Sequence, residues 1–244
     1  MNAFFSLFSF KLIAALTILL FTLLSGLWPF FTRKPEWQCS RLEALASGVF
    51  LGAALLHMLP DSVHGFMAMG YHYPYPFLIL GSVFLLLLLI EQYQQFSGGM
   101  ILLSTLLLSI HSFLEGAALG VSLFSTALLI FIAIMAHKGA ASFALATQIN
   151  RSHFSLKIRG LTFAIFASMT PLGIFMGSFV IASSHSQLSV LTPIFNAMAA
   201  GTFLYIGTLH GLEQSPLIRH CRQLSHFFYM LMGFVFMALL AVWI

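Results

Sequence analysis

The sequence predicts an all-α integral membrane protein whose chain crosses the lipid bilayer eight times. Of its 244 residues, 60% are hydrophobic and only 7% are charged, and the mean hydropathy is +0.99. So few charges could hardly keep a water-soluble domain dispersed. Apolar stretches of about 20 residues, the length that a helix needs to cross the hydrocarbon core, recur along the whole chain. We therefore expect one transmembrane domain over residues 1–244.

The first four expected spans are apolar runs over residues 3–26, 42–60, 75–92 and 100–124. The first could be mistaken for a signal peptide. Its apolar run is long, however, and most of its basic residues follow the run, whereas a signal peptide has them before it. We interpret it as a spanning helix.

The last four expected spans cover residues 125–148, 160–184, 192–214 and 226–244. The fifth follows the fourth with almost no loop. Pro171 lies inside the sixth, where it would free a backbone carbonyl and break or kink the helix.

Positive charge gathers on one side of this eight-span path. Eight of the ten basic residues follow the first, fifth and seventh spans: Arg33, Lys34, Arg41, Arg151, Lys157, Arg159, Arg219 and Arg222. The loops on the other side contain no Lys or Arg, so the positive-inside rule places both termini outside the cytoplasm. We expect the membrane to be the plasma (cell inner) membrane. Topology thus explains the net charge of +4 without nucleic acid as a partner. Of the two remaining lysines, Lys11 is expected to snorkel to the membrane interface, whereas Lys138 lies too deep to do so.

Two segments of the chain align without gaps and predict an inverted repeat. GVFLGAALLHMLPDS, residues 48–62, and GTFLYIGTLHGLEQS, residues 201–215, are identical at seven of fifteen positions. The second span runs outward and the seventh inward, so an axis in the membrane plane would relate them, as in many transporters. Chance similarity between two helices rich in Leu and Gly is the competing explanation. The repeat pairs His57, near the outer end, with His210, near the inner end.

Small residues predict close helix packing. Three pairs of glycines lie four residues apart, which permits helices to approach closely: Gly48 and Gly52, Gly116 and Gly120, Gly173 and Gly177.

Three metal-ligand residues are expected to meet in the centre of the membrane. His111 lies 13 residues before Phe124, at the turn between the fourth and fifth spans, and His137 lies 13 residues after it. At 1.5 Å per residue, both histidines are roughly 20 Å from the turn and share one depth. Glu115 lies one helical turn from His111 on the same face. Ionisable residues at this depth are costly and usually functional.

The ligand chemistry suits a divalent transition metal. Two imidazoles and a carboxylate bind Zn²⁺ well and also accept Fe²⁺, Mn²⁺, Co²⁺ or Cd²⁺. We expect the metal to be the transported substrate, with no resident cofactor. His57 and Asp61, four residues apart, would collect it outside, and His210 and Glu213 would receive it inside. Ser112 could contribute an oxygen ligand.

Several motifs resemble the ZIP family of divalent-metal transporters, particularly the subgroup with a His-Lys pair on the fifth helix. They are HSFLEGAALG, HKGAASFALA, HMLPDS, TPLGIFMG and AGTFLYIG, and they extend over essentially the whole chain. The resemblance implies eight helices in a three-two-three arrangement with an inverted repeat. It also implies external termini, metal movement toward the cytoplasm, and a metal site at His111, Glu115 and His137.

The chain also departs from the family pattern. Lys138 and Ala141 stand where many members place acidic ligands for a second metal, and Ser112 replaces an Asn. A protonated ammonium cannot bind a metal and repels a second dication. We therefore expect a single metal.

Other interpretations remain open at this point. An intramembrane zinc hydrolase would use the same residue types, with an open ligand position for water and a general base. A channel or structural membrane protein without metal is a third alternative. The oligomeric state is also open, and a homodimer is one alternative. The lipid bilayer is the other expected partner.

Overall fold

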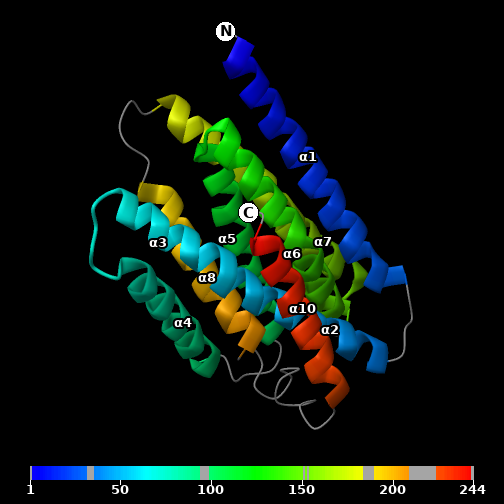
Figure 1. Ribbon diagram of the computed structural model, residues 1–244. Helices are drawn as coiled ribbons and strands as arrows, with labels where there is room; N and C mark the ends of the chain where they lie inside the picture. Colours follow the sequence, from blue (N-terminus) through cyan, green and yellow to red (C-terminus); the bar gives the residue numbers. More distant parts are fainter. Residues whose placement is uncertain are drawn as a thin grey trace.

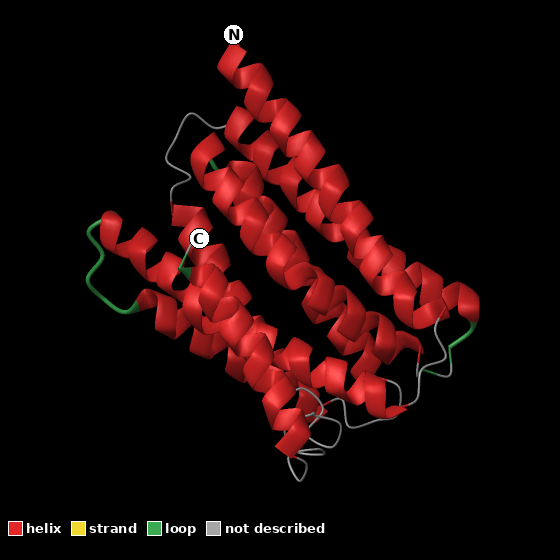
Figure 2. Cartoon of the chain, turned by 45° about the vertical axis from the view of Figure 1, so that its right-hand side comes forward, coloured by secondary structure: helices red, strands yellow, loops and turns green. Residues whose placement is uncertain are grey.

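The described part of the computed structural model is helical throughout, with short turns and no strand (Figure 2). It comprises residues 2–31, 36–93, 99–150, 152, 154–183, 190–208 and 224–242. The helices are α1 (Asn2–Phe31), α2 (Glu36–Ala53), α3 (Leu59–Ala68), α4 (Tyr75–Tyr93), α5 (Gly99–Val121), α6 (Phe124–Asn150), α7 (Leu156–Ser183), α8 (Leu191–Thr208) and α10 (Leu224–Ala241). A π-helical turn, η1 (Ala54–Met58), joins α2 to α3 without a break.

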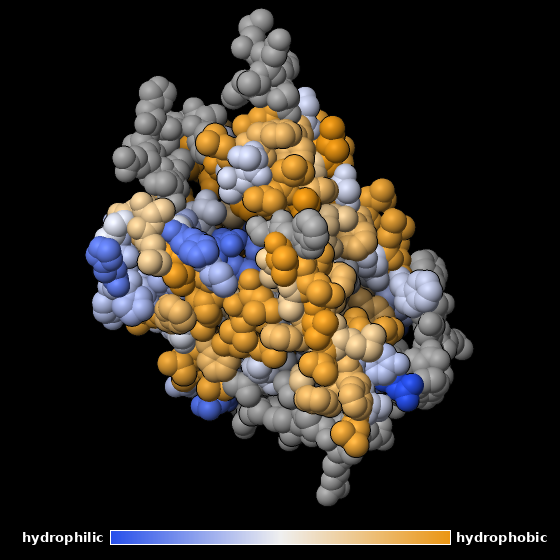
Figure 3. Space-filling view, in the orientation of Figure 1, coloured by the Kyte–Doolittle hydropathy of each residue, from blue (hydrophilic) through white to orange (hydrophobic). Residues whose placement is uncertain are grey.

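Several of these helices are suited to a bilayer. Five are long and apolar enough to cross one: Leu7–Pro29, Arg41–Ala68, Phe124–Asn150, Leu156–Val180 and Leu224–Ala241. Two shorter apolar helices are Tyr75–Ile90 and Thr105–Val121. The face in Figure 3 is largely hydrophobic. On α1, for example, Ile13 and Leu24 are 61% and 62% exposed, as expected of side chains that contact lipid.

The helices associate in pairs around a central α5. The most extensive contacts join α5 to α7, α2 to α10, α1 to α6 and α4 to α8. In Figure 1, α1 borders one side of the bundle and α4 the opposite side. The apolar core between α2, α6, α7 and α8 is filled by large side chains such as Phe50, Phe166 and Phe203. This apolar core surrounds the polar residues of the candidate site, which is described below.

Glycines bring α5 and α7 into backbone contact, as the spacing predicted. A Cβ atom on Gly116 would collide with the carbonyl oxygen of Thr170, and one on Gly173 would collide with that of Phe113. The α2–α10 pair behaves in the same way, because a Cβ on Gly48 would collide with the carbonyl of Met230. Pro171 does not break α7, which continues to Ser183.

The π-helical turn in the second span contains His57. Pro60 follows it, at the start of α3. A proline cannot donate to the carbonyl four residues earlier, here that of Leu56, and its ring crowds that carbonyl. A locally wider turn relieves this crowding, and π turns of this kind are frequent at functional sites.

Lys11 makes a contact that the sequence analysis did not anticipate. Its side chain is buried, 7% exposed, and its Nζ atom donates a 2.5 Å hydrogen bond to the carbonyl oxygen of Gly120. Snorkelling of Lys11 to the membrane interface stays a prediction. The last carbonyls of a helix have no intrahelical partner and carry partial negative charge. Lys11 of α1 satisfies one of them at the end of α5.

Candidate metal centre

His111, Glu115 and His137 meet in the interior of the helix bundle. Ser122 and Leu123 form the tight turn between α5 and α6, so the two helices run antiparallel and bring His137 opposite the other two residues. His137 Nε2 lies 2.6 Å and His111 Nε2 lies 3.1 Å from the same oxygen, Glu115 Oε1. One ligand atom from each residue lies within 4.8 Å of the others. The spacing argument from the sequence therefore placed these three residues together correctly.

The cluster is almost fully dry and incompletely paired. His111, Glu115 and His137 are 0%, 6% and 1% exposed. Glu115 Oε2 and His137 Nδ1 have no hydrogen-bond partner among the described residues. Buried polar atoms are nearly always paired in native proteins, and unpaired ones often mark the position of an ion. Two imidazoles and one carboxylate in a buried cluster are a suitable zinc donor set.

An aromatic ring from α8 holds the two imidazoles in place. The Phe203 ring stacks on His111 with 3.6 Å between ring centroids, and it lies nearly perpendicular to the His137 ring with 5.0 Å between centroids. The hydroxyl of Thr202 lies 3.0 Å from His111 Nδ1. The sequence analysis did not assign Thr202 or Phe203 to the site, although both lie in the segment that carries the repeat.

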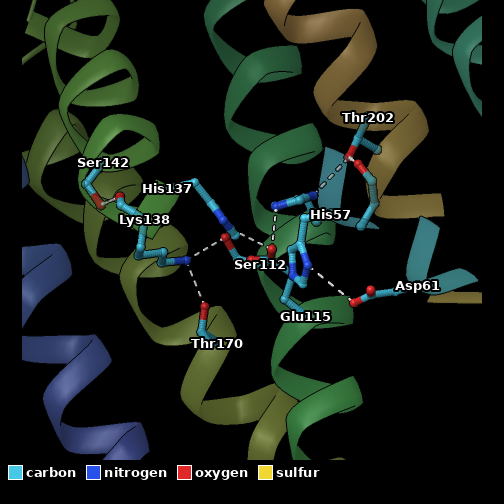
Figure 4. A network of polar contacts seen from close by, with 11 residues as sticks. His57, Asp61, Ser112, Glu115, His137, Lys138, Ser142, Thr170 and Thr202 are labelled. Carbon is cyan, nitrogen blue, oxygen red and sulfur yellow. Dashed lines mark hydrogen bonds and ion pairs between the residues drawn. The ribbon is translucent and has the colours of Figure 1, made fainter. Parts of the chain in front are cut away.

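A buried ammonium group lies beside the cluster. Lys138 is 1% exposed, and its Nζ atom donates 2.7 Å hydrogen bonds to Ser112 Oγ and Thr170 Oγ1 (Figure 4). It also lies 4.6 Å from the centroid of the Phe166 ring, in cation–π geometry. One lone pair of the Ser112 hydroxyl is thus directed at Lys138. A ligand role for Ser112 stays a prediction.

His57 lies close enough to the cluster to interact with it electrostatically. It is 8% exposed, and Figure 4 shows its ring beside Glu115. It lies within electrostatic range of both Glu115 and His137. Its Nδ1 atom is 3.3 Å from Asp61 Oδ2, whose side chain is 38% exposed. His57 and Asp61 therefore connect the dry cluster with a more accessible region.

The expected exit residues, His210 and Glu213, lie outside the described residues. Their role stays a prediction.

Comparisons with known proteins identify relatives along most of the chain. A family model described as "ZIP Zinc transporter" matches residues 8–99 and 95–241. The human protein named Zinc transporter ZIP1 is 28% identical in an alignment 265 positions long, which covers 84% of this chain and 82% of that protein. Mouse Zinc transporter ZIP2 is 26% identical in an alignment 306 positions long, which covers 96% of this chain and 97% of that protein. Protein zntD of Dictyostelium discoideum is 36% identical in an alignment 144 positions long, which covers 56% of this chain and 20% of that larger protein.

Proposed function

We propose that this chain, which belongs to the ZIP family of zinc transporters, carries zinc across a membrane toward the cytoplasm. The zinc passes through a site made by His111, Glu115 and His137. One observation supports this site above all: the ligand atoms of these buried residues lie within 4.8 Å of one another. A membrane protein rarely maintains three ionisable groups at this depth without a functional reason.

Metal transport follows from the family, and the intramembrane zinc hydrolase does not. The relatives are named as zinc transporters, and the family model carries the same description. The protein is thus a transporter and not an enzyme. An intramembrane hydrolase finds no support in these comparisons.

The path of the metal can be described by ligand exchange. His57 and Asp61 take up a hydrated cation on the outer side, and the proximity of His57 to Glu115 allows it to pass the cation inward. His111, Glu115 and His137 then replace most of the remaining water. His210 and Glu213 receive the metal on the inner side. Each step exchanges one ligand while others still hold the cation, which avoids the cost of a bare dication in a dry core.

A single metal occupies this site. Lys138 places one positive charge beside the cluster, held by two hydroxyl groups and an aromatic ring. A second dication at the same place would be repelled in a region of low dielectric constant. Zinc is the proposed substrate, while Fe²⁺, Mn²⁺, Co²⁺ and Cd²⁺ are compatible with the same ligand types.

The proposed architecture is eight transmembrane helices in a three-two-three arrangement with an inverted repeat, formed by one domain over residues 1–244. Phe50 and Phe203, which are equivalent positions of the repeat, contact each other with 4.8 Å between ring centroids. Equivalent residues that lie near a two-fold axis are expected to meet in this way. We place both termini outside the cytoplasm in the plasma membrane, on the distribution of basic residues, and propose a homodimer.

Uptake of metal into proteoliposomes tests the function. Purified protein should catalyse saturable accumulation of radioactive zinc, with Fe²⁺, Mn²⁺, Co²⁺ and Cd²⁺ measured in parallel. Liposomes with the His111→Ala, His137→Ala double variant provide the matched control. Equal zinc uptake by the parental protein and this variant would overturn the proposed site, and no uptake by either would overturn transport by this chain.

A further inference from the structure

A threonine on one helix contacts a proposed metal ligand on another. Thr202 of α8 is 3% exposed and His111 of α5 is fully buried, and Thr202 Oγ1 lies 3.0 Å from His111 Nδ1. The contact faces away from Glu115, which approaches the other ring nitrogen, Nε2.

The direction of this hydrogen bond follows from the second contact of the threonine. The Thr202 hydroxyl donates to the backbone carbonyl of Ala199 at 2.7 Å. A carbonyl has no hydrogen, so two oxygens this close repel each other unless the hydroxyl proton lies between them. A hydroxyl has one proton only. Thr202 Oγ1 can therefore offer only a lone pair to His111, and His111 Nδ1 must carry the proton that joins them.

We propose that Thr202 is a positioning residue that keeps His111 in the tautomer able to bind metal. With the proton on Nδ1, a neutral imidazole has its lone pair on Nε2, the nitrogen that faces Glu115 and the cluster. Metal-binding histidines commonly donate their other N–H to a fixed acceptor, which sets both the tautomer and the orientation of the ring. This inference rests on the proposed function, in which His111 is a ligand.

The alternative tautomer of His111 also has an acceptor nearby, which explains why a competing acceptor at Nδ1 is needed. Glu115 Oε1 lies 3.1 Å from His111 Nε2 and could accept a proton from that nitrogen. In that state His111 would present an N–H to the metal site and could not bind. Thr202 supplies the competing acceptor at Nδ1. Within the described residues, the Nδ1 atom of His137 has no such partner. Thr202 therefore restrains the tautomer of His111 and not that of His137.

The first experiment reads the tautomer directly in the metal-free protein. Nitrogen NMR of protein labelled with ¹⁵N-histidine in lipid nanodiscs distinguishes Nδ1–H from Nε2–H imidazoles, and the His111 signals are identified by their loss in His111→Ala. We expect Nδ1–H in the parental protein and in Thr202→Ser, which keeps the hydroxyl. In Thr202→Val, which keeps the shape without the hydroxyl, the proton should move to Nε2, with the His137 signals unchanged. A parental His111 protonated at Nε2, or at both nitrogens, overturns the proposal even if the valine variant does not fold.

The second experiment measures zinc affinity by competition with a chelator. Loss of such a supporting contact typically weakens metal binding about 10- to 100-fold, so Thr202→Val should show a decrease of this order and Thr202→Ser should restore the parental affinity. Thr22→Val is the matched control, because Thr22 is also fully buried and its hydroxyl also donates to a carbonyl of its own helix, that of Ile18. It should bind zinc as the parental protein does.

The two proposals fail in different ways. A parental protein that binds no zinc while His111 remains an Nδ1–H tautomer contradicts the metal site and leaves the hydrogen-bond assignment intact. Normal zinc affinity and an unchanged His111 tautomer in Thr202→Val contradict the positioning role and leave the metal site intact.

Discussion

The ammonium group of Lys138 lies 2.7 Å from the hydroxyl of Ser112, the residue that directly follows His111. An ammonium group thus lies beside the proposed metal ligands, on the helix that also provides His137. Its two hydroxyl partners and the ring of Phe166 make its position well defined. The charge of the site is therefore partly determined by the protein itself.

This charge can be reversed. Lys138→Asp should allow a second dication next to the first, because it replaces a repulsive ammonium by a carboxylate ligand. Metal analysis of purified protein should give one zinc per chain for the parental protein and two for the variant. Lys157→Asp makes the same change in charge at an exposed position of α7 and should leave one zinc. Two zinc ions per parental chain would contradict the role of Lys138.

The three proposed ligands should act as one unit. His111→Ala, Glu115→Ala and His137→Ala should each lower zinc uptake by one to two orders of magnitude or more, since each removes a ligand from a shared site. The double variants should lose little beyond the single ones, because residues that act together are not additive. Uptake by reconstituted protein, normalised to protein in the membrane, measures this. Additive losses in the His111 and His137 double variant would indicate two independent sites.

The contact between α5 and α7 leaves no room for a methyl group. Gly116→Ala should destabilise the protein by roughly 1–3 kcal/mol, the usual range for overpacking, because the new Cβ meets the carbonyl of Thr170. Thermal unfolding in detergent measures the effect. Gly81→Ala in α4 is the control, since no atom lies within 4 Å of its added Cβ. Equal unfolding temperatures for the two variants would show that the helices can separate freely.

The proposed orientation can be tested with single cysteines in a background without Cys39 and Cys221. Positions next to Arg33, Lys157 and Arg219 should be protected from impermeant thiol reagents applied to intact cells, and Gln187 should react. The reason is the segregation of basic residues between the two sides of the membrane. Permeabilised cells, in which every position should react, serve as the control. External labelling beside Lys157 would reverse the assigned topology.

Features that depend on neighbouring parts of the chain were the ones that the sequence predicted well. A tight turn after Val121 makes α5 and α6 antiparallel, so equal distances from the turn placed His111 and His137 at one depth. The glycine spacing similarly predicted that helices approach closely, although it did not predict that α5 and α7 are the partners. These relationships follow from helix geometry alone.

Features that depend on distant packing could not be predicted in this way. Lys11 is 109 residues from its partner Gly120, and Thr202 is 91 residues from His111. No periodicity relates such pairs. Their contacts exist only once α1 packs near the end of α5 and α8 packs against its middle. For the same reason the electrostatic contact of His57 with Glu115 was not expected, because it depends on how the span that contains η1 packs in the bundle.

The π-helical turn at Ala54–Met58 has a consequence for how sequences of this kind are compared. Removing one residue from an ordinary α-helix rotates everything beyond the deletion by about 100°, which would turn Asp61 and the rest of α3 away from their partners. A π turn already accommodates one residue more than an α-helical turn. A homologue that is one residue shorter between Gly52 and Pro60 can therefore keep both halves of this span in register, and a gap in an alignment belongs there rather than in the loops on either side.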